Sequence, residues 1–109
     1  MTPHELLQGF RDGRWMPLNG AEALPQQLLP QGPGVLVSSG GSSGGRRICL
    51  QPLDHLDQSA AATAHWLQGI DLDPGEVLIC NPLPMHHVSG LMPWWRSRCW
   101  GSIHVPLAP

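Results

Sequence analysis

The chain has 109 residues, of which 41% are hydrophobic and only 13% are charged, and its formal net charge is −2. Because globular domains usually carry about 25% charged residues, this composition leaves little charged surface and is typical of an interior part of a larger protein. The basic residues form no stripe beyond Arg46–Arg47 and the pair Arg96 and Arg98, which argues against nucleic acid as the main partner.

The N-terminal third predicts one helix followed by loops. Thr2-Pro3-His4-Glu5 is a capping box with proline at the first helical position, and Gly13 is expected to end the helix. The apolar face of this helix consists of Leu6, Leu7 and Phe10. Residues 14–34 contain four prolines and are predicted to form loops, with a short helical turn within residues 21–29.

Two strands and the longest helix are expected next. Gly34–Ser38 and Arg46–Leu50 contain apolar runs that flank a glycine-rich segment, which indicates a strand pair joined by a loop. A helix is predicted over Leu53–Gln68, with Asp54 as its cap and Gly69 at its end. Its buried face is expected to hold Leu56, Ala60, Thr63, Trp66 and Leu67.

The rest of the chain predicts a strand, a helix and a strand. Asp71–Gly75 has turn composition, and Glu76–Cys80 is predicted to be a strand that is apolar on both faces, as in a doubly covered sheet. A helix is expected over Val88–Cys99, with a kink at Pro93, and a last strand over Ser102–Val105. The alternation of strands with helices predicts an α/β fold with βαβ units and an incomplete sheet.

The glycine-rich segment Ser38–Arg47 is the first candidate site. Glycine backbone N–H groups can turn toward one anion, serine hydroxyls add donors, and arginine adds a charged, forked donor set. This combination suits the phosphates of a nucleotide. The segment matches neither the Walker pattern nor the dinucleotide-binding pattern. The alternative interpretation is a flexible Gly/Ser linker.

The second candidate site is Leu83–Gly90, between the predicted strand at 76–80 and the helix at 88–99. Its adjacent histidines, His86 and His87, suggest a metal pair at first sight. However, neighbouring residues on a strand point to opposite faces, and no second His or Cys motif accompanies them. A core or cleft-lining role is therefore favoured, and no metal ligand is predicted.

The glycine-rich segment resembles the phosphate loop S-G-T-T-G-x-P-K of the adenylate-forming superfamily of acyl-CoA ligases. The eight residues from Gly40 fit this form without a gap. Gly40 stands at the serine position, Ser42 and Ser43 hold the threonine positions, and Arg46 and Arg47 replace the proline and the lysine.

Some forty residues later the superfamily has L-P-L-F-H-x-x-G, and Leu83–Gly90 is similar to it, with His87 as the motif histidine. The sequence L-P-x-x-H-V-S-G followed by Trp95-Arg96 resembles the o-succinylbenzoate–CoA ligases of quinone biosynthesis. Core packing explains the neighbouring tryptophans equally well, and Arg98 is expected to be a solvated surface charge.

The resemblance implies a role for each matched residue. The phosphates of ATP would be bound by Gly40, Gly41, Ser42, Ser43, Gly44, Gly45 and Arg47. His87 would be the catalytic residue that borders the acyl pocket or positions the reacting carboxylate. Ser89 and Arg96 would bind a carboxylate of the acid substrate, which is chemically reasonable because a hydroxyl and a bidentate guanidinium are good carboxylate ligands.

The resemblance implies a two-step reaction with ATP, Mg²⁺ and CoA: the carboxylate is adenylated, and the CoA thiol then takes the acyl group. It covers most of this chain, but only an early part of the family's large domain. The Mg²⁺-binding motif and the catalytic lysine of the family are not present. The chain is therefore expected to be the N-terminal part of the large domain, inactive alone and prone to self-association.

Two alternatives stay open at this point. One is another aryl- or acyl-CoA ligase with different pocket residues. The other is a small non-enzymatic module that binds an anion or a partner protein, which is favoured if the chain is naturally complete at 109 residues.

The expected compartment is the cytoplasm. The three cysteines, Cys49, Cys80 and Cys99, have neither disulfide nor metal-ligand spacing, and an odd, scattered count fits a reducing environment. Polar residues interrupt the N-terminus, so it lacks the apolar core of a signal peptide. No apolar run approaches the length needed to span a membrane.

Overall fold

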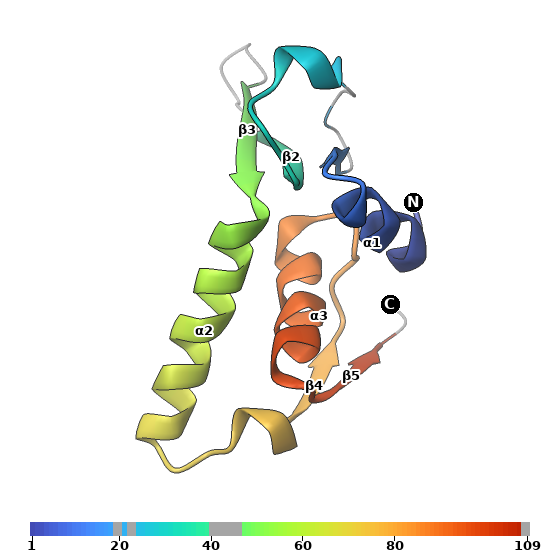
Figure 1. Ribbon diagram of the computed structural model, residues 1–109. Helices are drawn as coiled ribbons and strands as arrows, with labels where there is room; N and C mark the ends of the chain where they lie inside the picture. The colour runs from blue at the N-terminus through green and yellow to red at the C-terminus, as the bar shows by residue number, and fades with distance from the viewer. Residues whose placement is uncertain (19–20, 22–23, 40–46, 108–109) are drawn as a thin grey trace. The chain divides into compact units, whose positions relative to one another are not determined.

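The computed structural model describes residues 1–18, 21, 24–39 and 47–107. The chain divides into two compact units, Met1–Asp54 and His55–Pro109. Within the described ranges it has α/β character, with three α-helices and two small sheets (Figure 1). The predicted α/β class is therefore confirmed at this level.

The first unit begins with helix α1, Pro3–Arg11, and the predicted cap is confirmed. The Thr2 hydroxyl oxygen accepts a hydrogen bond of 3.1 Å from the Glu5 backbone N–H, and Pro3 occupies the first turn, where its missing N–H costs nothing. Leu6 and Phe10 are buried, as expected for the apolar face. The last helical residue is Arg11, Asp12 is the C-cap, and Gly13 follows with a φ of 73°, the left-handed conformation that commonly ends a helix, so the predicted stop is confirmed.

A three-stranded sheet follows, with the order β1-β2-β3. The strand pair β2, Gly34–Ser39, and β3, Arg47–Pro52, is antiparallel, which confirms the predicted pair. Strand β1, Trp15–Pro17, was expected to be loop and instead runs parallel to β2. The predicted helical turn is the short 3₁₀ helix η1, Gln26–Leu28.

The side chain of Gln26 completes the hydrogen bonding of β1. Its Oε1 accepts a bond of 2.8 Å from the Trp15 backbone N–H, and its Nε2 donates to the Trp15 carbonyl at 3.2 Å. The Trp15 indole N–H donates to the Pro30 carbonyl at 2.8 Å, so this nearly fully buried ring leaves no polar atom unsatisfied. These contacts explain why a three-residue strand forms within a proline-rich stretch.

Helix α2, Leu53–Gly69, agrees with the predicted range. Asp54 does not cap it, because the helix already begins at Leu53 and Asp54 lies in its first turn. Leu56 and Ala60 are buried as predicted, whereas Trp66 is 63% exposed. Because successive helical residues are rotated by about 100°, Trp66 lies at the margin of the buried face that includes Leu56 and Ala60, which explains its exposure.

The second unit contains a βαβ arrangement. Strand β4, Leu78–Asn81, leads into α3, Val88–Trp100, and then into β5, Ile103–Pro106, which is parallel to β4. Before β4, the 3₁₀ helix η2 spans Pro74–Glu76. The βαβ prediction is confirmed for β4–α3–β5, but not for β3–α2–β4, because β3 and β4 belong to different sheets.

The β4–β5 sheet is not covered on both faces within the described residues. Helix α3 lies against both strands. On this pair of strands Leu78 is 61% exposed and its register partner Ile103 is 67% exposed. The expectation of a doubly covered strand is therefore not met, and an apolar strip made by these two residues faces solvent.

Candidate functional site

The segment 40–46 lies outside the described residues, so the phosphate-binding roles of Gly40, Gly41, Ser42, Ser43, Gly44 and Gly45 stay predictions. Its flanks are described: β2 ends at Ser39, β3 begins at Arg47, and these two residues are register partners. The segment therefore joins two paired strands of one sheet and does not connect two domains. This topology disfavours the linker interpretation. Arg47 itself is exposed at the start of β3.

The histidine motif follows β4 and runs into the first turn of α3, at the point where the chain leaves the carboxyl end of a parallel strand. Ligands of open α/β sheets bind at such ends. Gly90 sits in the first turn of α3, where an added Cβ would overlap the Pro84 carbonyl. Glycine at this position therefore lets the helix start pack directly against the motif segment.

Asn81 connects the two ends of this segment by hydrogen bonds, a role not predicted from the sequence. It is only 2% exposed. Its Nδ2 donates to the Gly90 carbonyl at 2.8 Å, and its Oδ1 accepts from the Leu83 backbone N–H at 3.1 Å. The sequence does carry one signal for this role, because Asn81 is a polar residue at the end of an apolar strand.

The same Asn81 side chain contacts β5. Its Nδ2 lies 3.0 Å from Nε2 of His104. Because the carboxamide nitrogen only donates, Nε2 must accept, and the ring is neutral with its proton on Nδ1. Burial lowers the pKa of His104, which favours the same neutral form.

His87 is the N-cap residue of α3, but its imidazole makes no capping hydrogen bond. Both His86 and His87 are exposed, with ring centroids 4.5 Å apart, so neither lies in the core, and the cleft-lining alternative stays a prediction. Ser89, in the first turn of the helix, is also exposed. Among the described residues no group of three or more His, Cys, Asp or Glu could hold a metal ion.

Arg96 lies two helical turns beyond Ser89 on the same face of α3, since seven residues correspond to nearly two turns and a rise of about 10 Å. It is half-buried and lines a pocket of about 260 Å³ that also involves α2 and β4. Neither Ser89 nor His87 lines that pocket. The two residues predicted to bind a carboxylate, Ser89 and Arg96, therefore lie on one face of α3 but in different surroundings.

Helix α3 is fastened to α2 by two indole groups. Trp95 Nε1 donates to Asp57 Oδ1 at 2.8 Å, and Trp100 Nε1 donates to the Ala60 carbonyl at 2.9 Å. Trp95 is buried, which agrees with the core-packing interpretation. Arg98 is exposed, with its guanidinium 5.6 Å from the Trp94 ring, and confirms the expected surface charge.

The Cys99 thiol lies 3.7 Å from the same Asp57 carboxylate. Burial raises the pKa of the Cys99 thiol, and the negative Asp57 raises it further. Cys49, Cys80 and Cys99 are all free thiols, in agreement with the absence of disulfide spacing. The surroundings of Cys99 therefore keep it protonated and do not activate it as a nucleophile.

A second hollow, of about 370 Å³, lies at the carboxyl ends of β4 and β5. It is lined by Leu83, Pro84 and Met85 of the histidine motif, together with Asn81 and Leu107.

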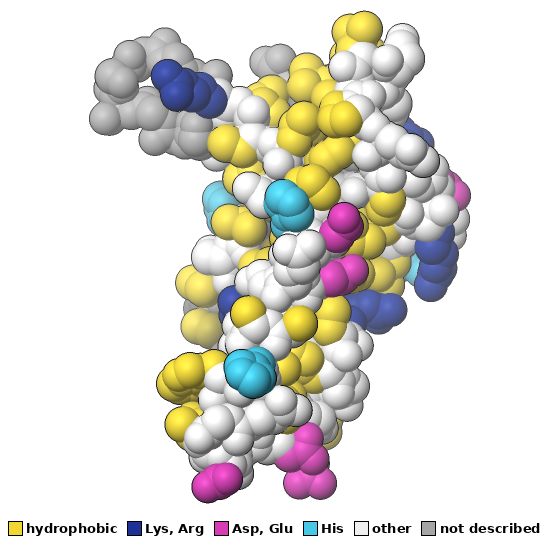
Figure 2. Space-filling view, turned by 60° about the vertical axis from the view of Figure 1, so that its left-hand side comes forward, with side chains coloured by type: hydrophobic (Ala, Val, Ile, Leu, Met, Phe, Trp, Pro, Cys, Tyr) yellow, Lys and Arg dark blue, Asp and Glu magenta, His cyan; other side chains and the backbone are white. Residues whose placement is uncertain are grey.

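Figure 2 shows large hydrophobic areas and only scattered charged side chains on the face it presents, as the composition leads one to expect.

Comparison with protein-family models gives no match, and comparison with curated proteins gives no significant match. In the described part of the chain, no helix combines the length and apolar character needed to cross a membrane.

Proposed function

We propose that this chain is the N-terminal part of the large domain of an adenylate-forming acid–CoA ligase, with o-succinylbenzoate as its acid. The observation that carries the proposal is the position of the two motif-like segments. Gly40–Arg47 joins the adjacent strands β2 and β3, and Leu83–Gly90 leaves the carboxyl end of β4 in a βαβ unit. The second is the kind of connection where α/β enzymes bind ligands, and the first is a glycine-rich connection of the kind whose backbone N–H groups can surround an anion.

In this proposal the glycine-rich segment and Arg47 hold the β- and γ-phosphates of ATP. Their donors stabilise the negative charge that grows on the leaving pyrophosphate when the acid attacks the α-phosphate. The exposed His87 is available to orient the attacking carboxylate. Ser89 and Arg96 bind the second carboxylate of the acid, which requires the Arg96 side chain to leave its pocket and turn toward the N-terminus of α3.

Residues for Mg²⁺ and CoA would come from other parts of the complete enzyme, because the matched segments contain no carboxylate. The chain alone is therefore expected to release no pyrophosphate from ATP. The cytoplasm is the proposed compartment. Another aryl- or acyl-CoA ligase would use the same phosphate-binding residues and differ in the acid it accepts.

The test is the adenylation half-reaction of the protein encoded by the whole open reading frame, measured by pyrophosphate exchange. Arg47→Ala should lower kcat/KM for ATP by about 30- to 1,000-fold, which corresponds to about 2–4 kcal/mol of lost transition-state stabilisation. Arg98→Ala, which removes an exposed arginine far along α3, is the matched control and should change it less than about twofold.

An unchanged kcat/KM in Arg47→Ala would remove the phosphate role of the glycine-rich segment. A reading frame that ends at Pro109, shown by its agreement with the intact-protein mass, would favour the non-enzymatic module. Exchange with an aryl acid other than o-succinylbenzoate would keep the ligase class and change the substrate.

A further inference from the structure

The Asn81 carboxamide is held in one orientation by two backbone groups of the segment that it connects. The Gly90 carbonyl lies 2.8 Å from Nδ2 and can only accept, whereas the Leu83 N–H lies 3.1 Å from Oδ1 and can only donate. Turning the carboxamide over would therefore oppose two acceptors at Gly90 and two donors at Leu83. The second N–H of Nδ2 is available for His104 Nε2, which lies 3.0 Å away.

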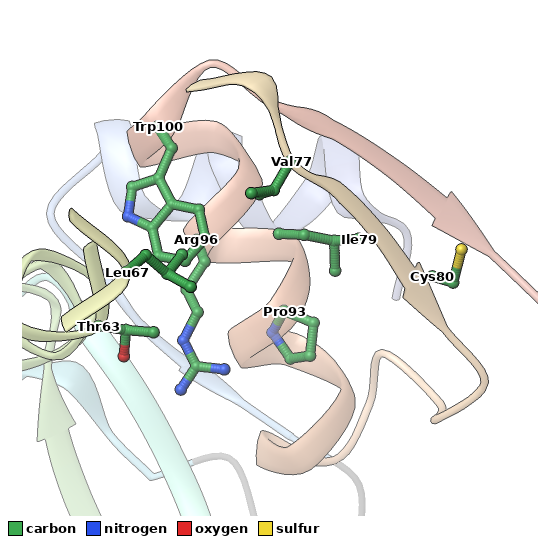
Figure 3. Close-up of a pocket in the computed structure, with 8 residues that line it drawn as sticks. All are labelled: Thr63, Leu67, Val77, Ile79, Cys80, Pro93, Arg96 and Trp100. Atoms are coloured by element: carbon green, nitrogen blue, oxygen red, sulfur yellow. The ribbon is translucent and has the colours of Figure 1, made fainter. Parts of the chain in front are cut away.

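His104 lies on the face of the β4–β5 sheet that packs against α3. Its register partner is Ile79, and Figure 3 shows the Ile79 side chain directed toward Pro93 of α3, with Cys80 on the other side of the strand. A ring protonated on both nitrogens offers only donors. Protonation of His104 therefore sets a donor against Nδ2 of a side chain that is only 2% exposed, where an unsatisfied donor is unfavourable.

The charged and titratable groups on the elements packed against His104 face other partners. Strand β4 carries Cys80, whose exposed thiol lies on the opposite face of the sheet. Burial is the cause that lowers the pKa of His104, and no neighbouring charge contributes to the shift. Three groups of α3 face its own Trp94 ring or the side chains of α2: Arg96, Arg98 and Cys99. In the motif segment, His86 and His87 are exposed, so their titration needs a control.

The segment Pro82–Met85 depends on the Asn81 side chain for its attachment. Two of its four residues are prolines, which have no backbone N–H to donate. The Leu83 N–H donates to Asn81, and the bond of 3.2 Å from the His87 N–H to the Pro84 carbonyl closes a turn within the motif itself. The same segment lines the hollow of about 370 Å³ at the carboxyl ends of β4 and β5. The shape of that hollow therefore depends on the orientation of one carboxamide.

We propose that Asn81 and His104 form a pH-sensitive switch, in which protonation of the imidazole turns the carboxamide over and releases the segment Pro82–Met85. In the turned arrangement Oδ1 accepts from the His104 Nε2–H, and the bonds to Leu83 and Gly90 are lost. A hydrogen bond from a charged donor is about twice as strong as a neutral one, so the bond gained nearly balances the two lost. Two arrangements of similar free energy, biased by a proton, are what a histidine switch requires.

The switch needs no ligand, so it goes beyond the proposed function and operates in a chain with no ligase activity. The test is a pH titration of the whole ¹⁵N-labelled chain by NMR, from about pH 8 to about pH 5. The ring nitrogen signals of His104 give its midpoint, and the Asn81 side-chain NH₂ signals should shift with the same midpoint. This part uses the unaltered protein and so does not depend on any variant folding.

Hydrogen exchange measures the release itself. The protection of the Leu83 N–H, corrected for the intrinsic exchange rate at each pH, should fall by about tenfold or more as His104 becomes protonated. The Leu107 N–H is the internal control, because it donates to the Asn81 backbone carbonyl at 2.8 Å and does not involve the carboxamide. Its protection should stay constant. Equal losses at Leu83 and Leu107 would show unfolding of the whole unit and would overturn the proposal.

Variants then assign the step to one histidine. His104→Gln keeps a side-chain oxygen that can accept from Asn81 and does not titrate, so the pH-dependent step at Leu83 should disappear. His86→Gln removes an exposed histidine from the motif segment and should leave the step unchanged. A step that persists in His104→Gln would overturn the proposal. So would constant Leu83 protection while His104 titrates, because the imidazole would then leave Asn81 without releasing the segment.

Discussion

At the scale of single residues, Asn81 and His104 show how one carboxamide can set a protonation state. The Asn81 Nδ2 donor requires a neutral acceptor at His104 Nε2, and burial of the ring lowers its pKa. The carboxamide also fastens the segment that carries His87 and Ser89. Loss of the neutral imidazole would therefore weaken a contact at the candidate site.

This linkage predicts a pH dependence of stability. The pKa of His104 is lower in the folded chain than its ordinary value of 6.5. Well above pH 6.5 the His104 imidazole is neutral in both the folded and the unfolded state, and its contribution to the free energy of unfolding has its full value. As the pH falls from there through the lower folded pKa, the unfolded state binds the proton first, so the free energy of unfolding decreases.

Urea unfolding at pH 7.5, 6.5 and 5.5 measures this effect. The decrease in unfolding free energy at low pH should be smaller in His104→Gln than in the unaltered chain. His55→Gln, which removes an exposed histidine, should leave the decrease unchanged. A decrease that is the same in all three proteins would contradict the role of His104.

Gly90 supports a second prediction at this scale. Gly90→Ala should destabilise the chain by about 1–3 kcal/mol, because the new Cβ meets the Pro84 carbonyl and the helix or the motif segment must shift. Gly69→Ala is the matched control, since a Cβ there meets nothing within 4 Å. Urea unfolding measures the stability of both variants. Similar stabilities would contradict the prediction, because they would mean that the motif segment can move away from the new Cβ without a cost in free energy.

At the scale of secondary-structure elements, Asp57 joins α2 to α3. It accepts the indole N–H of the buried Trp95 and lies near the Cys99 thiol. Together with the bond from Trp100 to Ala60, this contact fixes how the helix that carries Arg96 lies on α2. The shape of the Arg96 pocket therefore depends on a carboxylate that does not line it.

Asp57→Ala should destabilise the chain by about 1–3 kcal/mol, because it leaves the Trp95 indole N–H without its acceptor. Asp57→Asn keeps an acceptor and should recover most of the loss. The Ala variant should also speed alkylation of Cys99 at pH 8, since removal of the negative charge lowers the pKa of that thiol. Thermal unfolding and peptide-resolved alkylation measure the two effects; equal losses in both variants would refute the hydrogen-bond explanation.

Patterns among neighbouring residues predicted most helices and strands, but few of the contacts that these elements make with distant segments. The Thr2-Pro3 cap, the helix from Leu53 and the strands on either side of residues 40–46 depend on nearby residues, and they were found. Strand β1 was missed because its partner Gln26 is eleven residues away. Asn81 was missed because its contact with His104 spans twenty-three residues.

The division into two sheets and the Arg96 pocket were not predictable for the same reason. Which strands pair, and what a helix face meets, depend on contacts between distant segments that one sequence does not reveal. The periodicity of α3 does put Ser89 and Arg96 on one face. It could not show that Arg96 lies among α2 and β4 side chains while Ser89 lies in solvent.

At the scale of the whole molecule, the exposed pair Leu78 and Ile103 predicts self-association. Parallel strands are normally covered on both faces, and here this strip is open. The average mass measured by light scattering should therefore rise with protein concentration. Leu78→Glu should suppress the rise, whereas Leu72→Glu, at an exposed leucine outside the sheet, should not. A constant monomer mass at the highest concentration would contradict the prediction.

The Gln26 side chain has a consequence for where such association can occur. It occupies both backbone groups of Trp15 that β1 would otherwise offer to an incoming strand. The Gln26 side chain thus caps the edge strand β1 and prevents a strand of another molecule from pairing with it. Contacts between copies of this chain should accordingly form at the second unit, and a Gln26→Ala substitution would open a new docking edge on the first.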